Sequence, residues 1–345
     1  MKYRHLGNSG LLVSRACLGT MTFGQEGWGC DRQTAFKIVN RFIDVGGNFI
    51  DTADVYVAGA SERILGEALR EHKRDDIVLA SKCYFRTDAK PNAKGLSRKH
   101  MIDACEASLK RLGVEYLDLY QLHGPDPCTP IAETLRSMDD LVRRGLVRYV
   151  GLSNFYAWQL TKANMTAATM GLETFCSGQY LYNLLRRDIE REILPACADQ
   201  GLGVMCWGPL ASGMLTGKYA GADKPAPGTR VDHRSAIDVP RFWNEDSFRI
   251  INEVSAVGGE LDRTPAQVAL AWLLHDPRVT CVILGATKLE QLESNLEVGD
   301  WDLPDEAHER LSSVVPFAGG YPQEWIDLTY PNTFNDAEFR PGGQG

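Results

Sequence analysis

The chain of 345 residues and 38.2 kDa is long enough for two average domains or one α/β barrel, and its 44% hydrophobic and 24% charged residues are typical of a globular protein. A net charge of −8 argues against a general nucleic-acid binder, because no basic stripe is present to replace counterions. The sequence contains no run of about 18 apolar residues, so no membrane span is predicted. The absence of a signal-peptide pattern at the N-terminus, and nine cysteines without Cys-x-x-Cys spacing, favour a cytoplasmic protein with reduced thiols and no metal site.

Short apolar runs alternate with segments of helical period from one end of the chain to the other. Residues 3–6 and 11–13 predict an N-terminal hairpin, because Gly-Asn-Ser-Gly joins them. The continuous apolar character of eight later runs is typical of parallel strands covered on both faces. These runs predict strands at 16–19, 48–51, 77–81, 117–122, 147–152, 176–180, 203–207 and 279–284.

Three of the intervening helices have recognisable ends. Ser97 is a candidate cap for a helix that carries apolar residues at helical spacing from Met101 to Leu112. Thr129 and Pro130 predict a cap and a first-turn proline for a helix that ends at Gly145. The run Thr-Pro-Ala-Gln at 264–267 predicts a capping box before a very apolar helix.

Eight β/α units in succession predict a single (β/α)8 TIM barrel over residues 1–345, with a core at about 3–315 and a tail at 316–345. A doubly wound sheet is the alternative, but its usual Gly-x-Gly-x-x-Gly after the first strand is missing. Two long stretches, 208–241 and 316–345, look irregular. At the C-terminal face of a barrel such loops would roof a site.

Four polar residues follow neighbouring predicted strands: Asp51, Tyr56, Lys82 and His123. Because the C-terminal ends of barrel strands converge on one mouth, we expect these side chains to meet. A lysine near a tyrosine lowers the phenol pKa from about 10, a carboxylate would fix the lysine, and a histidine could orient a carbonyl. Together they would form a proton donor for carbonyl reduction.

Each of these residues alone also has an ordinary explanation. Asp51 could cap a turn, Lys82 could be a solvated strand end, and His123 could be a turn residue before Gly-Pro. Other chemistries fit less well, because the sequence has no His-Glu-x-x-His, no Gly-x-Ser-x-Gly and no P-loop motif.

Longer runs around the four residues carry a family resemblance. The runs are Phe-Ile-Asp-Thr-Ala-Asp-Val-Tyr at 49–56, Leu-Ala-Ser-Lys at 79–82, Leu-Asp-Leu-Tyr-Gln-Leu-His at 117–123, Gly-Leu-Ser-Asn-Phe at 151–155 and Trp-Gly-Pro-Leu at 207–210. With them the chain resembles the aldo-keto reductases over roughly residues 3–315. It is nearer to the microbial oxidoreductases and potassium-channel β subunits of that superfamily than to the aldose reductases.

The resemblance implies a role for each residue. Tyr56 would be the general acid, and Lys82, paired with Asp51, would lower the pKa of the Tyr56 phenol towards neutrality. His123 would be a neutral imidazole that orients the carbonyl. A bound dinucleotide would carry the hydride, with Trp207 stacked on the nicotinamide ring. The cofactor-binding residues implied are Gly19, Thr20, Met21, Asp51, Ser153, Asn154, Gln179, Trp207, Gly208, Pro209, Leu210, Gly213, Lys218, Arg230, Gly285, Thr287, Gln291 and Asn295.

The segment after the eighth strand departs from the best-known reductases, which have Lys-Ser there and an arginine soon after. Here Leu-Gly-Ala-Thr-Lys at 284–288 occupies the region. NADPH remains the expected cofactor, NADP(H) being preferred over NAD(H). Arg230, Lys218 and Lys288 would supply positive charge for the 2′-phosphate, and the missing bidentate arginine leaves some room for NADH.

The expected substrate is a small carbonyl compound, held by loops at the barrel mouth. Aromatic walls suit a flat or apolar molecule, and none of these wall residues is a charged anchor for a carboxylate or phosphate. Aldehydes, ketones, keto-sugars and natural-product ketones stay open. The candidate pocket residues are Met21, Trp28, Tyr56, Tyr84, Phe85, Phe155, Tyr321 and Trp325.

Two other functions stay open beside the enzyme. The first is a cofactor-binding regulatory subunit of the channel-β type with little turnover, and the second is a non-catalytic scaffold, which would predict a broken tetrad. The tetrad of Asp51, Tyr56, Lys82 and His123 is complete. A homo-oligomer is an expectation by analogy alone.

Overall fold

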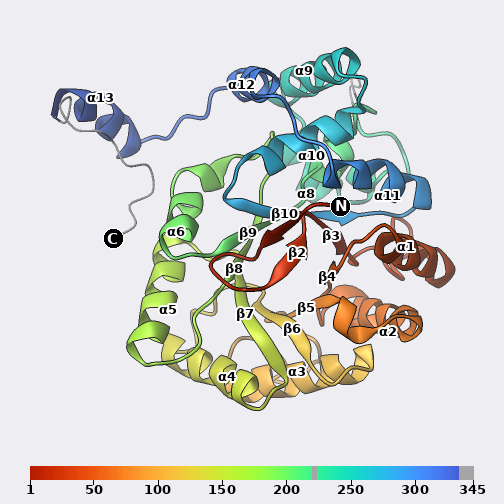
Figure 1. The fold of residues 1–345 in the computed structure, drawn as a ribbon, viewed down its shortest axis with the longest axis vertical. Helices are drawn as coiled ribbons and strands as arrows, with labels where there is room; N and C mark the ends of the chain where they lie inside the picture. The colour runs from red at the N-terminus through yellow and green to blue at the C-terminus, as the bar shows by residue number, and fades with distance from the viewer. Residues whose placement is uncertain (220–223, 334–345) are drawn as a thin grey trace.

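The computed structural model describes residues 1–219 and 224–333. Eight parallel strands close into a barrel in the order β10-β3-β4-β5-β6-β7-β8-β9, which confirms the predicted architecture (Figure 1). Each strand lies within about two residues of its predicted position. The strands are β3 Ala16–Gly19, β4 Phe49–Asp51, β5 Val78–Cys83, β6 Leu117–Leu122, β7 Val147–Ser153, β8 Ser177–Leu181, β9 Gly203–Trp207 and β10 Val279–Gly285.

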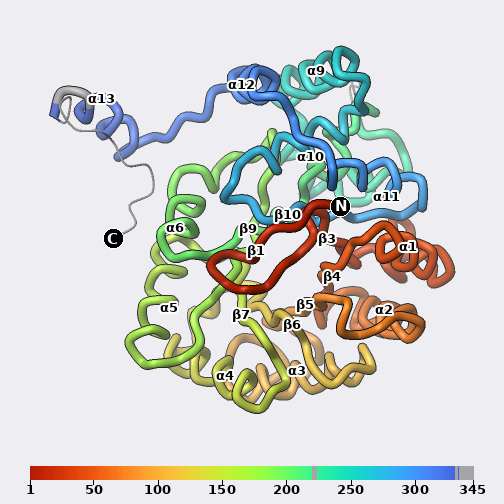
Figure 2. Tube along the Cα trace, viewed as in Figure 1, coloured from red at the N-terminus to blue at the C-terminus, as the bar shows by residue number. Residues whose placement is uncertain are grey.

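The predicted hairpin closes the N-terminal end of this barrel. Strands β1 (Tyr3–His5) and β2 (Leu12–Ser14) pair antiparallel, and Figure 2 shows them lying across the centre of the ring of strands. Leu6 and Val13 are fully buried and pack into the apolar cluster that fills the barrel interior. Because this end is plugged, a ligand can reach the barrel interior only from the opposite, C-terminal mouth.

A ring of helices surrounds the strands and covers their outer faces (Figure 1). Within the described chain, no helix is both long enough and apolar enough to cross a lipid bilayer. The ring consists of α1 Arg32–Asp44, α2 Ala60–Ala68, α3 Arg98–Leu112, α4 Ile131–Arg143, α5 Ala157–Thr169, α6 Ile193–Asp199, α10 Pro265–His275 and α11 Leu289–Leu296, with 3-10 turns η1 Tyr56–Gly59, η2 Leu69–Glu71, η3 Arg74–Asp76, η4 Asp188–Glu190 and η6 Glu297–Gly299.

Two of the three predicted helix caps are confirmed by the structure. The Ser97 side chain caps α3, and Thr264 with Gln267 forms the capping box of α10, as predicted. The prediction for α4 is wrong in one respect. Pro130 itself occupies the cap position, while the Thr129 hydroxyl donates to the carboxylate of Asp126 in the preceding turn.

Both stretches predicted to be irregular contain helices. The stretch after β9 holds η5 (Ala211–Thr216), α7 (Arg230–His233) and α8 (Ser235–Phe242), and α9 (Glu245–Glu260) follows it. The tail forms α13 (Gln323–Thr333), which in Figure 1 lies away from the barrel at the end of the segment that follows α12 (Asp305–Ser313). The Gly-rich end at 334–345 lies outside the described residues.

Candidate active site

Three of the four predicted catalytic side chains meet through one ammonium group at the C-terminal end of β4 and β5. Lys82 Nζ donates to Asp51 Oδ2 at 2.6 Å, to the Thr52 carbonyl at 2.8 Å and to the Tyr56 hydroxyl at 3.2 Å. Lys82 and Asp51 are buried, whereas Tyr56 and His123 are half-buried above them, their rings 5.9 Å apart. The Lys82–Asp51 ion pair is therefore buried, whereas Tyr56 and His123 are within reach of a ligand.

The electrostatics of Tyr56 differ from the sequence prediction. Burial raises the pKa of the phenol above its ordinary value, and the opposing effect of the Lys82 charge does not reverse that shift. The expected fall of the pKa towards neutrality is therefore wrong, because desolvation outweighs the ammonium. A phenol with a raised pKa stays protonated at neutral pH and is a proton donor.

The protonation states of Lys82 and His123 differ. Burial lowers the pKa of Lys82, but Asp51 and Tyr56 raise it above its usual value overall, so the ammonium stays charged. Burial and then the Lys82 charge hold the pKa of His123 well below its usual value. The imidazole is therefore neutral at physiological pH, as the resemblance implied.

Two glutamines complete the surroundings of Asp51. Gln121 Nε2 and Gln179 Nε2 both donate to Asp51 Oδ1, at 3.0 and 2.9 Å, so the carboxylate is satisfied on both oxygens. Gln121 is not among the predicted site residues. Its signal was available, because the two-residue period of β6 puts it on the same side as His123.

A chain of hydrogen bonds links His123 to the residues implied for the nicotinamide. Asn154, in a left-handed backbone conformation with φ of 61°, donates from Nδ2 to the His123 carbonyl at 3.0 Å. The Trp207 indole donates to Asn154 Oδ1 at 3.3 Å, and Ser153 Oγ donates to the Gln179 carbonyl at 2.8 Å. These residues from β7, β8 and β9 therefore lie together beside the tetrad.

A second buried network lies behind the tetrad and was missed. Glu62 accepts from Ser81 Oγ at 2.7 Å and from Arg111 Nε at 2.5 Å. Asp54 is buried beside it, and neither carboxylate oxygen has a hydrogen-bond partner within the described residues. Burial and the neighbouring Glu62 charge raise the pKa of Asp54 to about 7.

The remaining implied cofactor residues lie at or after the C-terminal ends of β3, β9 and β10, including η5 and α11. A side chain built at exposed Gly285 would meet nothing within 4 Å. Thr287 donates to Gln291 Oε1 at 3.1 Å through both its N–H and its hydroxyl, which orders the turn into α11. Lys218 and Lys288 make no ion pair within residues 1–219 and 224–333, so their charges suit phosphates.

A family model described as the aldo/keto reductase family matches residues 15–316. The chain belongs to this family. It is 38% identical over 326 residues to a protein of Oryza sativa named "Probable voltage-gated potassium channel subunit beta", covering 91% of this chain and 97% of that one. It is 38% identical to the oxidoreductase YrpG of Bacillus subtilis (93% and 98% covered) and 34% identical to norsolorinic acid reductase B of Dothistroma septosporum (95% and 85%).

Family membership makes the chain an oxidoreductase of the class that reduces carbonyl groups with a nicotinamide dinucleotide.

The predicted pocket residues do not all lie together. Phe85 stacks edge-on against His123 with ring centroids 4.8 Å apart, and Tyr84 packs against Phe85. Phe155 is instead buried in the main hydrophobic core.

The tail aromatics are not brought to the mouth. Tyr321 and Trp325 are 82% and 60% exposed, and α13 lies away from the barrel (Figure 1). Their predicted role as a pocket wall is therefore not supported, because the segment after α12 leads α13 outwards.

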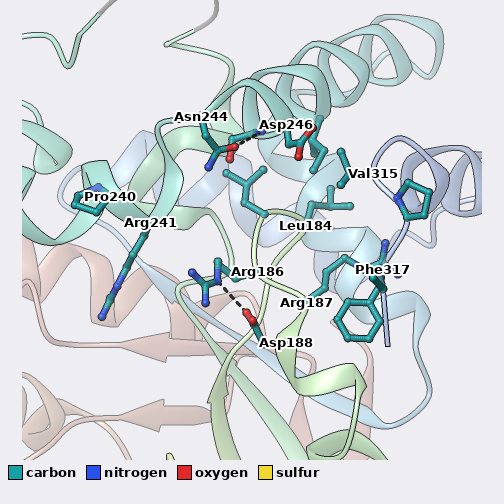
Figure 3. Close-up of a pocket in the computed structure, with 15 residues that line it drawn as sticks. Leu184, Arg186, Arg187, Asp188, Pro240, Arg241, Asn244, Asp246, Val315 and Phe317 are labelled. Carbon is teal, nitrogen blue, oxygen red and sulfur yellow. Dashed lines mark hydrogen bonds and ion pairs between the residues drawn. The ribbon is translucent and has the colours of Figure 1, made fainter. Parts of the chain in front are cut away.

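A groove of about 370 Å³ lies outside the tetrad. Figure 3 shows it between the segment after β8, the start of α9 and the segment after α12, with Arg186 paired to Asp188 at 2.9 Å. None of the four tetrad residues lines this groove, so the chemistry of the site does not depend on it.

Proposed function

We propose that this protein reduces an aldehyde or ketone to the alcohol with NADPH, and that Tyr56 is the general acid. The observation that carries the proposal is the pair of contacts made by Lys82 Nζ, to Asp51 at 2.6 Å and to the Tyr56 hydroxyl at 3.2 Å. A protonated phenol beside a fixed ammonium is suited to give a proton to a developing alkoxide.

Each residue contributes to one step of this proton transfer. Tyr56 gives its proton to the carbonyl oxygen, and the Lys82 ammonium stabilises the phenolate that remains. Asp51, held by Gln121 and Gln179, keeps the ammonium charged and in place. Neutral His123 orients the carbonyl oxygen towards Tyr56. The reduced nicotinamide, when bound, supplies the hydride to the carbonyl carbon.

The proposed cofactor site uses the loops that surround the tetrad. Ser153, Asn154 and Gln179 would hold the carboxamide, Trp207 would stack on the ring, and the loops from 208 to 213 and 285 to 295 would hold the phosphates and adenine. Lys218 and Lys288, which form no ion pair with the described residues, supply cations near these loops, which favours NADPH over NADH. Lys288→Ala should therefore raise KM for NADPH by about tenfold and leave KM for NADH nearly unchanged.

The decisive test replaces the phenol. Tyr56→Phe should lower kcat for a panel of aldehydes and ketones by at least about a thousandfold, because the proton donor is lost. NADPH binding, measured by fluorescence, should change little. Tyr84→Phe is the matched control, because its hydroxyl has no role in the proposal. Equal rates for Tyr56→Phe and the wild type would exclude Tyr56 as the acid.

The similarity to channel β subunits favours a second candidate, a cofactor-binding regulatory subunit with little turnover. Both candidates bind the dinucleotide, so binding alone does not separate them. Tight NADPH binding with no turnover of any carbonyl compound would support the regulatory subunit. Turnover that depends on Tyr56 supports the enzyme.

A further inference from the structure

The turn that follows Tyr56 has an unfavourable backbone conformation. Val57 and Ala58 have φ angles of 49° and 50°, and Gly59 follows with a φ of 80°, so three consecutive residues lie in the left-handed region. Glycine adopts this region readily, whereas a β-branched valine does not. Such strain persists only where other contacts fix the backbone. Contacts from outside the turn are therefore needed to keep its residues left-handed.

A buried carboxylate in the first turn of α2 supplies part of this support. Glu62 is fully buried, and it accepts from Ser81 Oγ at 2.7 Å and from Arg111 Nε at 2.5 Å. Ser81 directly precedes Lys82 on β5, and Arg111 lies in the last turn of α3. Because α2 continues the turn after Tyr56, this one carboxylate connects the turn both to the strand that carries Lys82 and to a helix of the outer ring.

Two arginines also contact the turn directly. A Cβ built at Gly59 would lie 2.8 Å from Arg111 Cδ, so the stem of this arginine lies against the backbone of the turn. Arg63 Nη2 donates to the Ala58 carbonyl at 3.3 Å. These contacts, together with the ion pair of Arg111, hold the turn in its left-handed conformation.

The position of the Tyr56 hydroxyl depends on this turn. Its hydrogen bond from Lys82 Nζ is long, at 3.2 Å, and its ring is only half-buried, so the bond alone does not fix the phenol. Val57 is the next residue along the chain, and a change in its backbone would move the ring. A displacement of about 1 Å in a reacting group can lower a rate by about a hundredfold.

We propose that Glu62 and Arg111 are positioning residues for carbonyl reduction: their ion pair holds the left-handed turn, and the turn holds the Tyr56 phenol beside Lys82. This inference rests on the proposed reductase function, in which Tyr56 is the general acid. Within the described chain, neither the Glu62 nor the Arg111 side chain forms a hydrogen bond with Tyr56 or Lys82, so both act through the turn. Their loss should therefore lower kcat and leave cofactor binding nearly intact.

The first test breaks the ion pair from the side of the arginine. Arg111→Met should lower kcat for the best substrate among a panel of benzaldehydes and cyclic ketones by about tenfold to a hundredfold, with KM for NADPH within about twofold of the wild type. Arg111→Lys keeps the charge and should restore part of kcat. Arg98→Met, a change of an exposed arginine at the start of the same helix, is the matched control and should retain kcat.

A double variant shows whether the effect passes through the proton donor. In the Tyr56→Phe background, Arg111→Met should cause no further loss of the residual rate, because the hydroxyl that it positions is already absent. Independent losses, in which Arg111→Met lowers the rate by the same factor with and without the Tyr56 hydroxyl, would contradict a positioning role.

A second pair of variants perturbs the turn without removing a charge. The Ala58 side chain is exposed, so substitutions there leave the buried packing unchanged. Ala58→Val should have a kcat at least about fivefold lower than that of Ala58→Gly, because a β-branched residue resists the left-handed region and glycine does not. Equal kcat values for the two variants would show that the conformation of the turn does not matter for the reaction.

Hydrogen exchange tests the same inference without turnover. Arg111→Met should raise the exchange rates of the amides of residues 54–62 by at least about tenfold, and Arg98→Met should not. Unchanged exchange in Arg111→Met, or a kcat equal to that of the wild type, would overturn the inference. Failure of the wild type to reduce any carbonyl compound would instead refute the reductase proposal, and the exchange rates would still decide whether Arg111 holds the turn.

Discussion

Removing the ammonium of Lys82 should destabilise the protein much more than removing it together with its carboxylate partner. The perturbation is Lys82→Met, compared with Asp51→Asn and with the double variant. The side chains of Lys82 and Asp51 are 0% and 3% exposed, so neither charge can turn to bulk water when its partner is lost. The single variants therefore each leave one buried charge without its counter-ion.

The magnitude follows from the contact distance. At 2.6 Å and an effective dielectric constant of about 20, the attraction is about 6 kcal/mol. Desolvation offsets part of it, so each single variant should lose about 3 to 5 kcal/mol. The double variant should lose only about 1 to 2 kcal/mol, because an asparagine at 51 can still accept from Gln121 and Gln179 and donate to the freed Thr52 carbonyl.

The assay is urea unfolding at pH 7, followed by circular dichroism, with the midpoints of the four proteins compared. The double variant should unfold at higher urea than either single variant, although all three lack activity. Additive losses, with the double variant the least stable of the four, would refute the view that these two charges stabilise the fold only as a pair.

Three further predictions concern the buried carboxylate, one helix and the imidazole. The pKa of Asp54 is about 7 in the folded protein and about 3.8 unfolded, so its contribution to stability is full below pH 4 and falls as pH rises to 7. Asp54→Asn should therefore raise the free energy of unfolding at pH 8 by up to about 4 kcal/mol, measured by urea unfolding, and should not raise it at pH 4. In α9, Gly258→Ala should cost about 1 to 3 kcal/mol, because its Cβ would lie 2.7 Å from the Arg263 carbonyl, while Gly259→Ala, with nothing within 4 Å, should gain up to about 1 kcal/mol in the same assay. The His123 imidazole should remain neutral at pH 6 by nitrogen NMR, and a protonated ring at that pH would contradict the assigned burial.

The barrel could be predicted from the sequence because its strands are covered on both faces and therefore read as continuous apolar runs. β6, for example, appears as Leu-Asp-Leu-Tyr-Gln-Leu, and its bounds were predicted without error. The convergence of Asp51, Tyr56 and Lys82 followed from barrel geometry alone, since each residue comes at or just after the C-terminal end of a strand.

Other features depend on three-dimensional packing that no local pattern encodes. The hydrogen bond from the Gln179 amide to Asp51 could not be predicted, because only the closing of the barrel brings β8 within reach of β4. Arg230 was grouped with Lys218 because both lie in the stretch after β9. Because that stretch forms α7, the Arg230 guanidinium lies over the Trp28 ring.

The raised pKa of Tyr56 changes how the lysine contributes to the chemistry. If Lys82 had made the phenol acidic in the resting protein, a large fraction of Tyr56 would be phenolate at neutral pH and could not donate. In the proposed reaction, burial keeps the proton on Tyr56 until a carbonyl oxygen becomes negative, and only then does the nearby ammonium act on the charge that appears. In the proposed reaction Lys82 therefore stabilises the transition state more than the ground state, and carbonyl reduction should persist into alkaline pH, because the raised pKa of Tyr56 delays ionisation of the phenol.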